Sequence, residues 1–151
     1  MATAAAVADT VERIETIRDV SDALRDAMLE LPRRNPREMK RFLNLWRFYL
    51  GVESRADQLP SDVEGMVVHG KSVARLVQIM LRWPKYLDRL GELHAGRTVL
   101  ADLLAAADDP ESWRVALHQA GMASAEAELT SLRELLAGSD PELAELSKRY
   151  L

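Results

Sequence analysis

The chain has no cysteine among its 151 residues. This absence excludes disulfides, thiol nucleophiles and cysteine-ligated metal or iron–sulfur centres, and it fits a reducing compartment, so we expect a cytoplasmic protein. No apolar run approaches the roughly eighteen residues of a membrane-spanning helix. The opening residues, MATAAA, lack the basic start and apolar core of a secretory signal. The sequence therefore predicts neither export nor a transmembrane segment.

Strand-like alternation and internal repeats are also missing from the sequence. Apolar residues instead recur at helical spacing along most of the chain, and 48% of all residues are hydrophobic, which is enough for a sizeable core. These features predict an all-α protein. We expect a single helical domain, 21–151, that forms an irregular bundle of about six to eight helices and follows a helical extension, 1–20.

Capping residues and prolines predict where the helices begin and end. Asp109 and Asp140 each precede a proline, which is typical of a helix start, and Trp83-Pro84 predicts a helix end followed by a new start. The predicted helices span 8–31, with a break near 18–21 that Ser21 would cap, and then 35–50, 66–82, 84–90, 98–107, 110–120, 124–136 and 141–151, with a loop at 51–60.

The segment Asn35–Asn44, NPREMKRFLN, joins a helix start to two different faces. Asn35 can cap the helix, and Pro36 fits its first position because the missing N–H costs nothing there. One side of the predicted helix carries an apolar stripe: Met39, Phe42, Leu43, Trp46, Tyr49 and Leu50. The opposite side carries a basic stripe: Arg37, Lys40, Arg41, Asn44 and Arg47. We expect the apolar stripe to be buried and the basic stripe to be available to a ligand.

Positive charge is concentrated around this helix. The whole chain has a net charge of -4, which argues against a general binder of polyanions. Between Leu31 and Leu50, however, six basic residues accompany one acid, Glu38, so the local balance is +5.

Residues Gly65–Ser72, GMVVHGKS, match the phosphate-loop pattern G-x-x-x-x-G-K-S. A working phosphate loop needs a buried strand before it and a second strand that supplies an acid for magnesium. The preceding residues contain proline and acids instead, and the best downstream acid, Asp102, lies in a predicted helix. The pattern thus favours a helix with Lys71 on its exposed face. A small nucleotide-binding enzyme that uses 65–72 remains an outlying alternative.

Two motifs together resemble the C-terminal helical region of KAP-family P-loop NTPases. They are Asn35-Pro36-Arg37-x-x-Lys40-Arg41-Phe42-x-Asn44 and the later Leu81-Arg82-Trp83-Pro84, which occur in the same order in that family. The resemblance covers about 21–90, and the ending 140–151 is similar more loosely. In that family a nucleotide-binding α/β core precedes the helical bundle, and this core has no counterpart in the present sequence.

The resemblance implies a lid or sensor role for the helical domain. Arg37 would correspond to a sensor arginine that reaches the terminal phosphate, and Lys40 and Arg41 would hold the core or the phosphates. ATP and magnesium would then be bound only together with an NTPase core, supplied in cis or by a separate chain. On this basis we expect the chain alone not to be an enzyme and to have no cofactor of its own.

Other interpretations of the residues remain open. The basic stripe could be solvated and paired with acids of the preceding helix: Asp19, Asp22, Asp26 and Glu30. A freestanding all-α adaptor could use the 37–47 face to bind protein, or nucleic acid with help from Trp46 and Tyr49. His69, His94 and His118 are predicted to be surface or helix-end residues rather than metal ligands. The three tryptophans are expected to anchor the core, and the oligomeric state is left open.

Overall fold

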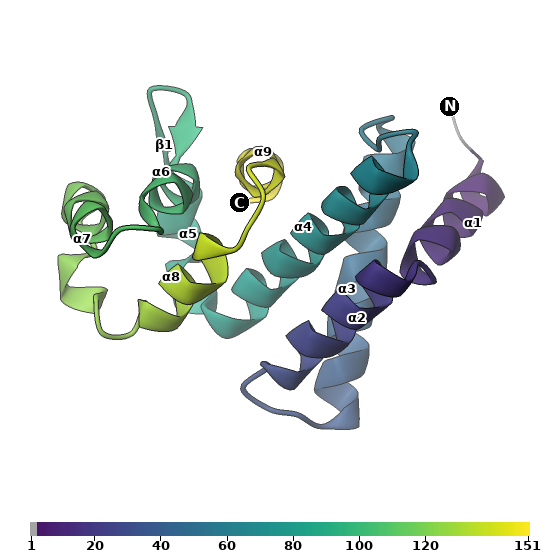
Figure 1. The fold of residues 1–151 in the computed structure, drawn as a ribbon, viewed down its shortest axis with the longest axis horizontal. Coiled ribbons are helices and arrows are strands. Elements are labelled where there is room, and N and C mark those ends of the chain that lie inside the picture. The colour runs from purple at the N-terminus through teal and green to yellow at the C-terminus, as the bar shows by residue number, and fades with distance from the viewer. Residues whose placement is uncertain (1–2) are drawn as a thin grey trace. The chain divides into compact units, whose positions relative to one another are not determined.

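The chain folds into two helical units, Met1–Arg82 and Trp83–Leu151, and each is described here by itself (Figure 1). The computed structural model describes residues 3–151; Met1 and Ala2, which begin the predicted extension 1–20, lie outside that range. Within it the elements are nine α-helices, two 3-10 turns and one small hairpin. The prediction of an irregular all-α bundle is therefore confirmed.

Four helices form the first unit: α1 (Ala4–Glu15), α2 (Arg18–Leu29), α3 (Pro36–Arg55) and α4 (Val63–Arg82). α4 packs against the other three, and α1 also packs against α3. Most of the predicted extension is thus the first helix of this unit.

Gly70 in α4 lies in close contact with residues of the other three helices of the first unit. A Cβ atom built on Gly70 would lie 3.2 Å from a methyl group of Ile14 and 3.3 Å from one of Val20. On another side, the Trp46 indole N–H donates a 2.9 Å hydrogen bond to the Gly70 carbonyl oxygen. Because Trp46 is fully buried, this bond satisfies a polar group that water cannot reach.

The second unit is built around α6 (Val99–Ala106), which contacts the helices on either side of it in sequence. Its other elements are a 3-10 turn (Pro84–Tyr86), α5 (Leu87–Leu90), β1 (Leu93–His94), β2 (Arg97–Thr98), α7 (Pro110–Gln119), a second 3-10 turn (Ala123–Ala125), α8 (Thr130–Ala137) and α9 (Glu142–Tyr150). As predicted, Asp109 caps α7, with its carboxylate accepting from the Ser112 N–H at 3.1 Å. Asp140 accepts from the Glu142 N–H at 2.9 Å, also at a predicted helix start.

The structure corrects the prediction that the chain has no strand. β1 and β2 form an antiparallel hairpin in which Leu93 pairs with Thr98. Its two-residue turn is Ala95-Gly96, and both residues have positive φ, 53° and 79°. Such a turn matches the natural twist of a hairpin, and Gly96 supplies the required conformation at little cost. Strands of two residues are too short to leave an alternating pattern in the sequence.

Several predicted helix boundaries were wrong. α3 continues through Gly51 to Arg55 instead of ending at the predicted loop, because a single glycine costs a helix only about 1 kcal/mol and the buried face continues with Leu50, Gly51 and Glu53. The break in the first predicted helix falls at Thr16–Ile17, and Ser21 lies inside α2 rather than capping it. The predicted helix 124–136 is divided into a tight 3-10 turn and α8, since the Ala125 N–H bonds to the Met122 carbonyl three residues back.

Among the helices of residues 3–151, none is both long enough and apolar enough to cross a membrane.

Two glycine substitutions test the packing of the first unit. At Gly70 a larger side chain must displace Ile14 and Val20, so Gly70→Leu is expected to lower the free energy of unfolding by about 1–3 kcal/mol. At Gly51 a Cβ would lie 3.6 Å from Val7, an ordinary contact, so Gly51→Ala should raise stability by up to ~1 kcal/mol through helix propensity. Urea denaturation of both variants measures the two effects, and equal destabilisation would contradict this packing.

Candidate functional site

The first turn of α3 is formed by the residues that the sequence predicted. The Asn35 side chain accepts a 2.9 Å hydrogen bond from the Glu38 N–H, and Pro36 occupies the first helical position. Asn35 itself is extended, with φ -111° and ψ 160°, as a capping residue should be. The helix start is therefore fixed locally by its own sequence.

The two faces of α3 are separated as predicted. Phe42, Trp46 and Leu50 are fully buried, and the other members of the apolar stripe are half-buried. Arg37, Lys40, Arg41 and Asn44 are exposed on the other side.

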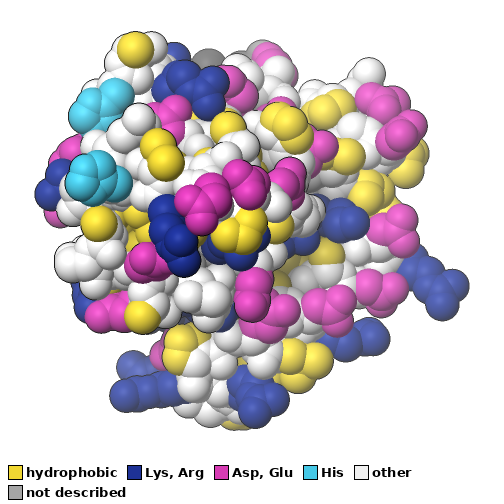
Figure 2. Space-filling model, turned by 60° about the vertical axis from the view of Figure 1, so that its left-hand side comes forward, with side chains coloured by type: hydrophobic (Ala, Val, Ile, Leu, Met, Phe, Trp, Pro, Cys, Tyr) yellow, Lys and Arg dark blue, Asp and Glu magenta, His cyan; other side chains and the backbone are white. Residues whose placement is uncertain are grey.

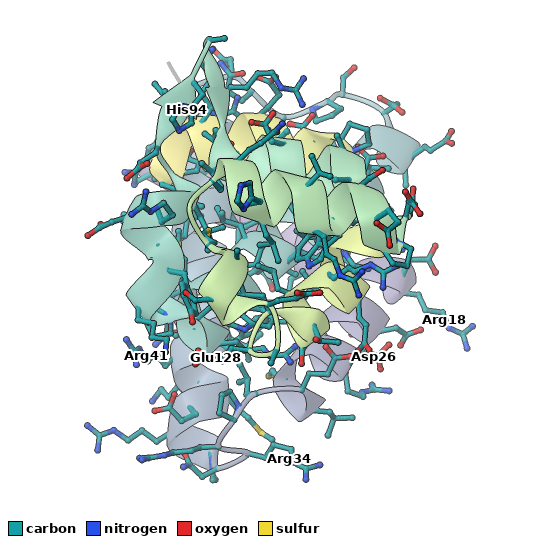
Figure 3. The ribbon with its side chains drawn as sticks, turned by 90° about the vertical axis from the view of Figure 1, so that its left-hand side faces the viewer. Arg18, Asp26, Arg34, Arg41, His94 and Glu128 are labelled. Carbon is teal, nitrogen blue, oxygen red and sulfur yellow. The ribbon has the colours of Figure 1, made fainter. Side chains whose placement is uncertain are left out.

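Five cations gather at the start of α3, and we call them the basic end: Arg33, Arg34, Arg37, Lys40 and Arg41. All five are exposed, and within residues 3–151 none of them forms an ion pair. Arg34 and Arg41, two of its members, both extend away from the ribbon (Figure 3). Figure 2 shows one side of the molecule, with Lys and Arg side chains gathered at its lower end. Acidic and basic side chains are mixed over the rest of that side.

Arg47 differs from the other members of the predicted basic stripe because it forms an ion pair with Glu15. Its guanidinium donates two hydrogen bonds to the Glu15 carboxylate of α1, at 2.6 and 3.1 Å. This pairing raises the pKa of Arg47 above its ordinary value. The predicted 37–47 face is thus divided into a free basic end and one arginine that ties α3 to α1.

Within residues 3–151, Arg37, Lys40, Arg41 and Asn44 are solvated, as one interpretation predicted, but the pairing with acids of the preceding helix that it also predicted is wrong. Asp22 lies 3.9 Å from Arg25 on its own helix. Glu30 accepts a 2.6 Å hydrogen bond from Gln78 and lies 3.4 Å from Arg82, both on α4. Gln78 is buried, and its amide bonds to this carboxylate.

A groove between α2 and α4 lies beside these contacts. Its α2 side carries Asp19, Asp22 and Asp26, and its α4 side carries Lys71 and Arg75. Burial lowers the pKa of Arg75, and the nearby Glu30 carboxylate opposes that shift. The acids of α2 therefore face cations of α4 rather than those of the basic end.

The phosphate-loop match, 65–72, lies wholly within α4. Its first glycine is close to the helix cap: the Gly65 N–H donates to the Asp62 carboxylate at 2.9 Å, and a Cβ there would lie 2.5 Å from Pro60. Its second glycine, Gly70, is the packing point described above. The backbone from 58 to 62 contains no strand. Since the N–H groups of 66–72 point along a helix, they cannot form a cradle around phosphate.

His69 was wrongly predicted to be a surface or helix-end residue. It is buried in the middle of α4, and its Nε2 lies 2.9 Å from Oε1 of Glu53, which is also fully buried. The spacing of His69 with Val73 and Leu76 places it on the buried face of the helix, and this spacing was a usable signal. His94 and His118 are exposed, as expected. Trp46, Trp83 and Trp113 are all buried, as predicted for core residues.

No family model matches this chain, and neither the curated proteins nor the solved structures contain a protein that is significantly similar to it.

A combined alanine variant tests whether the side chains of the basic end contribute to the stability of the fold. Replacing Arg37, Lys40 and Arg41 together removes no ion pair and relieves repulsion between like charges, so the free energy of unfolding should change by less than about 1 kcal/mol. Arg47→Ala serves as the matched control and should cost up to ~1 kcal/mol, because it breaks the bond to Glu15. A loss above about 2 kcal/mol in the triple variant would indicate that these cations hold the fold.

Proposed function

We propose that this chain is a lid- or sensor-like helical module whose basic end contacts the phosphates of a nucleotide held by an NTPase core. The observation that carries the proposal is the cluster of five exposed cations, free of ion pairs among the described residues, at the start of α3. The resemblance of Asn35–Asn44 and Leu81–Pro84 to KAP-family helical regions supports the choice of phosphate as the ligand.

The chemistry of the basic end suits phosphate oxygens. A guanidinium carries a permanent charge and offers several N–H donors in a fixed plane, so Arg37 can bind two oxygens of one phosphate group. The N-terminus of α3 adds the positive end of a 20-residue helix. Lys40 and Arg41 lie one turn further along the same exposed side and can hold a second phosphate. Together these groups would distinguish a nucleotide with its terminal phosphate from one without it.

The same exposure limits what the chain can do alone. Charges in contact with water gain little from a new partner, typically less than 1 kcal/mol for each pair. Tight binding would require a second surface that excludes water around the phosphates. We therefore assign ATP, magnesium and hydrolysis to the combined core and lid, with the core supplied in cis or by another chain, and not to this chain by itself.

An adaptor that binds nucleic acid through 37–47 has less support. Base stacking needs exposed aromatic faces beside the cations. Trp46 is fully buried and Tyr49 is half-buried, so neither offers an open ring face to a base. Arg47 is bound to Glu15. The basic end can still attract the backbone of a nucleic acid, and the experiment below includes that outcome.

Titration with tripolyphosphate in low salt, followed by calorimetry, tests the proposal. We expect weak binding by the whole chain, with a dissociation constant of about 1 mM or higher, because only exposed contacts form. Arg37→Ala should weaken it at least threefold. Lys71→Ala is the matched control, since Lys71 is also an exposed cation but lies in the phosphate-loop match, and it should have no effect.

Three results would contradict the proposal. Loss of binding in Lys71→Ala rather than in Arg37→Ala would assign phosphate to 65–72. Micromolar binding of ATP by the chain alone would remove the need for a core. Binding of a single-stranded oligonucleotide that is much tighter than binding of tripolyphosphate, with a steep dependence on salt, would favour the adaptor.

A further inference from the structure

The exposed side of α3 continues beyond the basic end. Four exposed residues follow one another there at intervals of three or four positions: Arg37, Arg41, Asn44 and Phe48. At ~3.6 residues per turn, this spacing places their side chains in one row along the helix. We call it the outer row of α3. It begins with cations, continues with an amide and ends with an aromatic ring.

Phe48 ends the outer row with an exposed ring. Its relative exposure is 61%, although Trp46 and Leu50 of the same helix are fully buried. The ring lies edge to face with that of Tyr49, with 5.2 Å between the centroids. Such a contact covers one edge or one face, so at least one face of the Phe48 ring stays open to a planar ligand. A single exposed apolar residue is ordinary by itself, and it is the cations in the same row that give this one a use.

The polar members of the outer row form no polar contacts in the part of the chain that the structure describes. Arg37 and Arg41 have no ion pair there, and the Asn44 amide has no hydrogen bond. The amide can therefore bond to a hydroxyl group of a ligand. The cations repel one another, and an anion would relieve that repulsion. The row is thus complementary to a molecule with an anionic end, a hydroxylated middle and a flat apolar end.

The distances along the outer row match the parts of a nucleoside triphosphate. Arg37 and Arg41 are about one turn apart, ~6 Å along the axis, which suits neighbouring phosphate groups. Asn44 follows after ~4.5 Å and Phe48 after a further ~6 Å. The row is therefore ~16 Å long. This length is comparable with that of an extended nucleoside triphosphate, in which phosphates, sugar and base follow in the same order.

A single ring at the end of the row favours one nucleotide over a strand of nucleic acid. Proteins that bind single strands offer several aromatic side chains on which successive bases stack. The other aromatic residues of α3 are not exposed, since Phe42 and Trp46 are buried and Tyr49 is half-buried. The outer row can therefore hold one base.

We propose that Phe48 is the base-binding residue of this module, and that a nucleoside triphosphate lies along the outer row with its base stacked on the Phe48 ring. The triphosphate is held at the basic end, and the sugar lies at Asn44. This inference rests on the proposed function and adds to it the position of the base. A phenyl ring offers no hydrogen bond to a base edge, so stacking strength alone sets the preference. Adenine and guanine should bind alike, and both should bind better than a pyrimidine.

Calorimetric titrations of the whole chain in low salt compare ATP with tripolyphosphate. Tripolyphosphate carries at least as much charge as ATP but has no base, so tighter binding of ATP cannot come from charge. Stacking should make ATP bind at least about fivefold tighter than tripolyphosphate. GTP should match ATP, and UTP should bind more weakly.

Two variants separate the ring from apolar surface in general. Phe48→Leu keeps an exposed apolar side chain but removes the ring, so the affinity for ATP should fall to that for tripolyphosphate, which itself should not change. Leu29→Ser is the matched control, because Leu29 is exposed but lies on α2, and it should affect neither ligand. Both variants change exposed side chains, and circular dichroism should show unchanged helical content.

A tryptophan at position 48 reports stacking directly. The native tryptophans, Trp46, Trp83 and Trp113, are all buried, so Phe48→Trp adds one exposed indole with its own fluorescence. ATP should quench this added emission because the base stacks on the indole, whereas tripolyphosphate should not.

The possible failures point to different errors. Equal affinity for ATP and tripolyphosphate, or a preference for ATP that persists in Phe48→Leu, would overturn the role of Phe48. The proposed function would survive either result if Arg37→Ala still weakened tripolyphosphate binding. A wild-type chain that binds neither ligand would contradict the proposed function and this inference with it. Quenching of the added tryptophan by a single-stranded oligonucleotide at concentrations far below those of ATP would replace the nucleotide with a strand.

Discussion

The arrangement of the first unit depends on the contact between α3 and α4 at Trp46 and Gly70. A glycine in a helix interior costs up to ~1 kcal/mol relative to alanine, so its presence needs a compensating contact. Here the missing side chain admits the methyl groups of Ile14 and Val20, and the buried Gly70 carbonyl accepts the Trp46 indole N–H. One residue thus sets how closely α1, α2 and α3 can surround α4.

Only part of α3 is held in the core, so its start can carry charge. Phe42, Trp46 and Leu50 hold α3 in the core, whereas Asn35 and Pro36 start the helix without needing tertiary contacts. The first turn is therefore free to present cations to solvent. Repulsion among five nearby cations disfavours this arrangement, and it would be relieved by an anion.

The features that the sequence predicted are those set by neighbouring residues. The cap at Asn35, the two faces of α3 and the exposure of Arg37, Lys40 and Arg41 all follow from local spacing, and the structure confirms them. Features that depend on distant partners were missed. Gln78 bonds to Glu30 across 48 positions, and His69 lies beside Glu53 across 16, so periodicity alone could not identify these bonds. The phosphate-loop letters were correctly predicted to form a helix with Lys71 exposed, and their glycines serve packing against Pro60, Ile14 and Val20.

The most direct test of the central claim is a two-dimensional 15N–1H NMR titration of the whole chain with tripolyphosphate. If the basic end contacts phosphate, amide shifts should be largest from Arg33 to Arg41 and in the arginine side-chain N–H signals of that segment. Residues 65–72 should stay unchanged, because the Gly65 N–H is bound to the Asp62 carboxylate and the following N–H groups donate to carbonyl oxygens four residues back. Shifts centred on 65–72, or absent from the start of α3, would contradict the account.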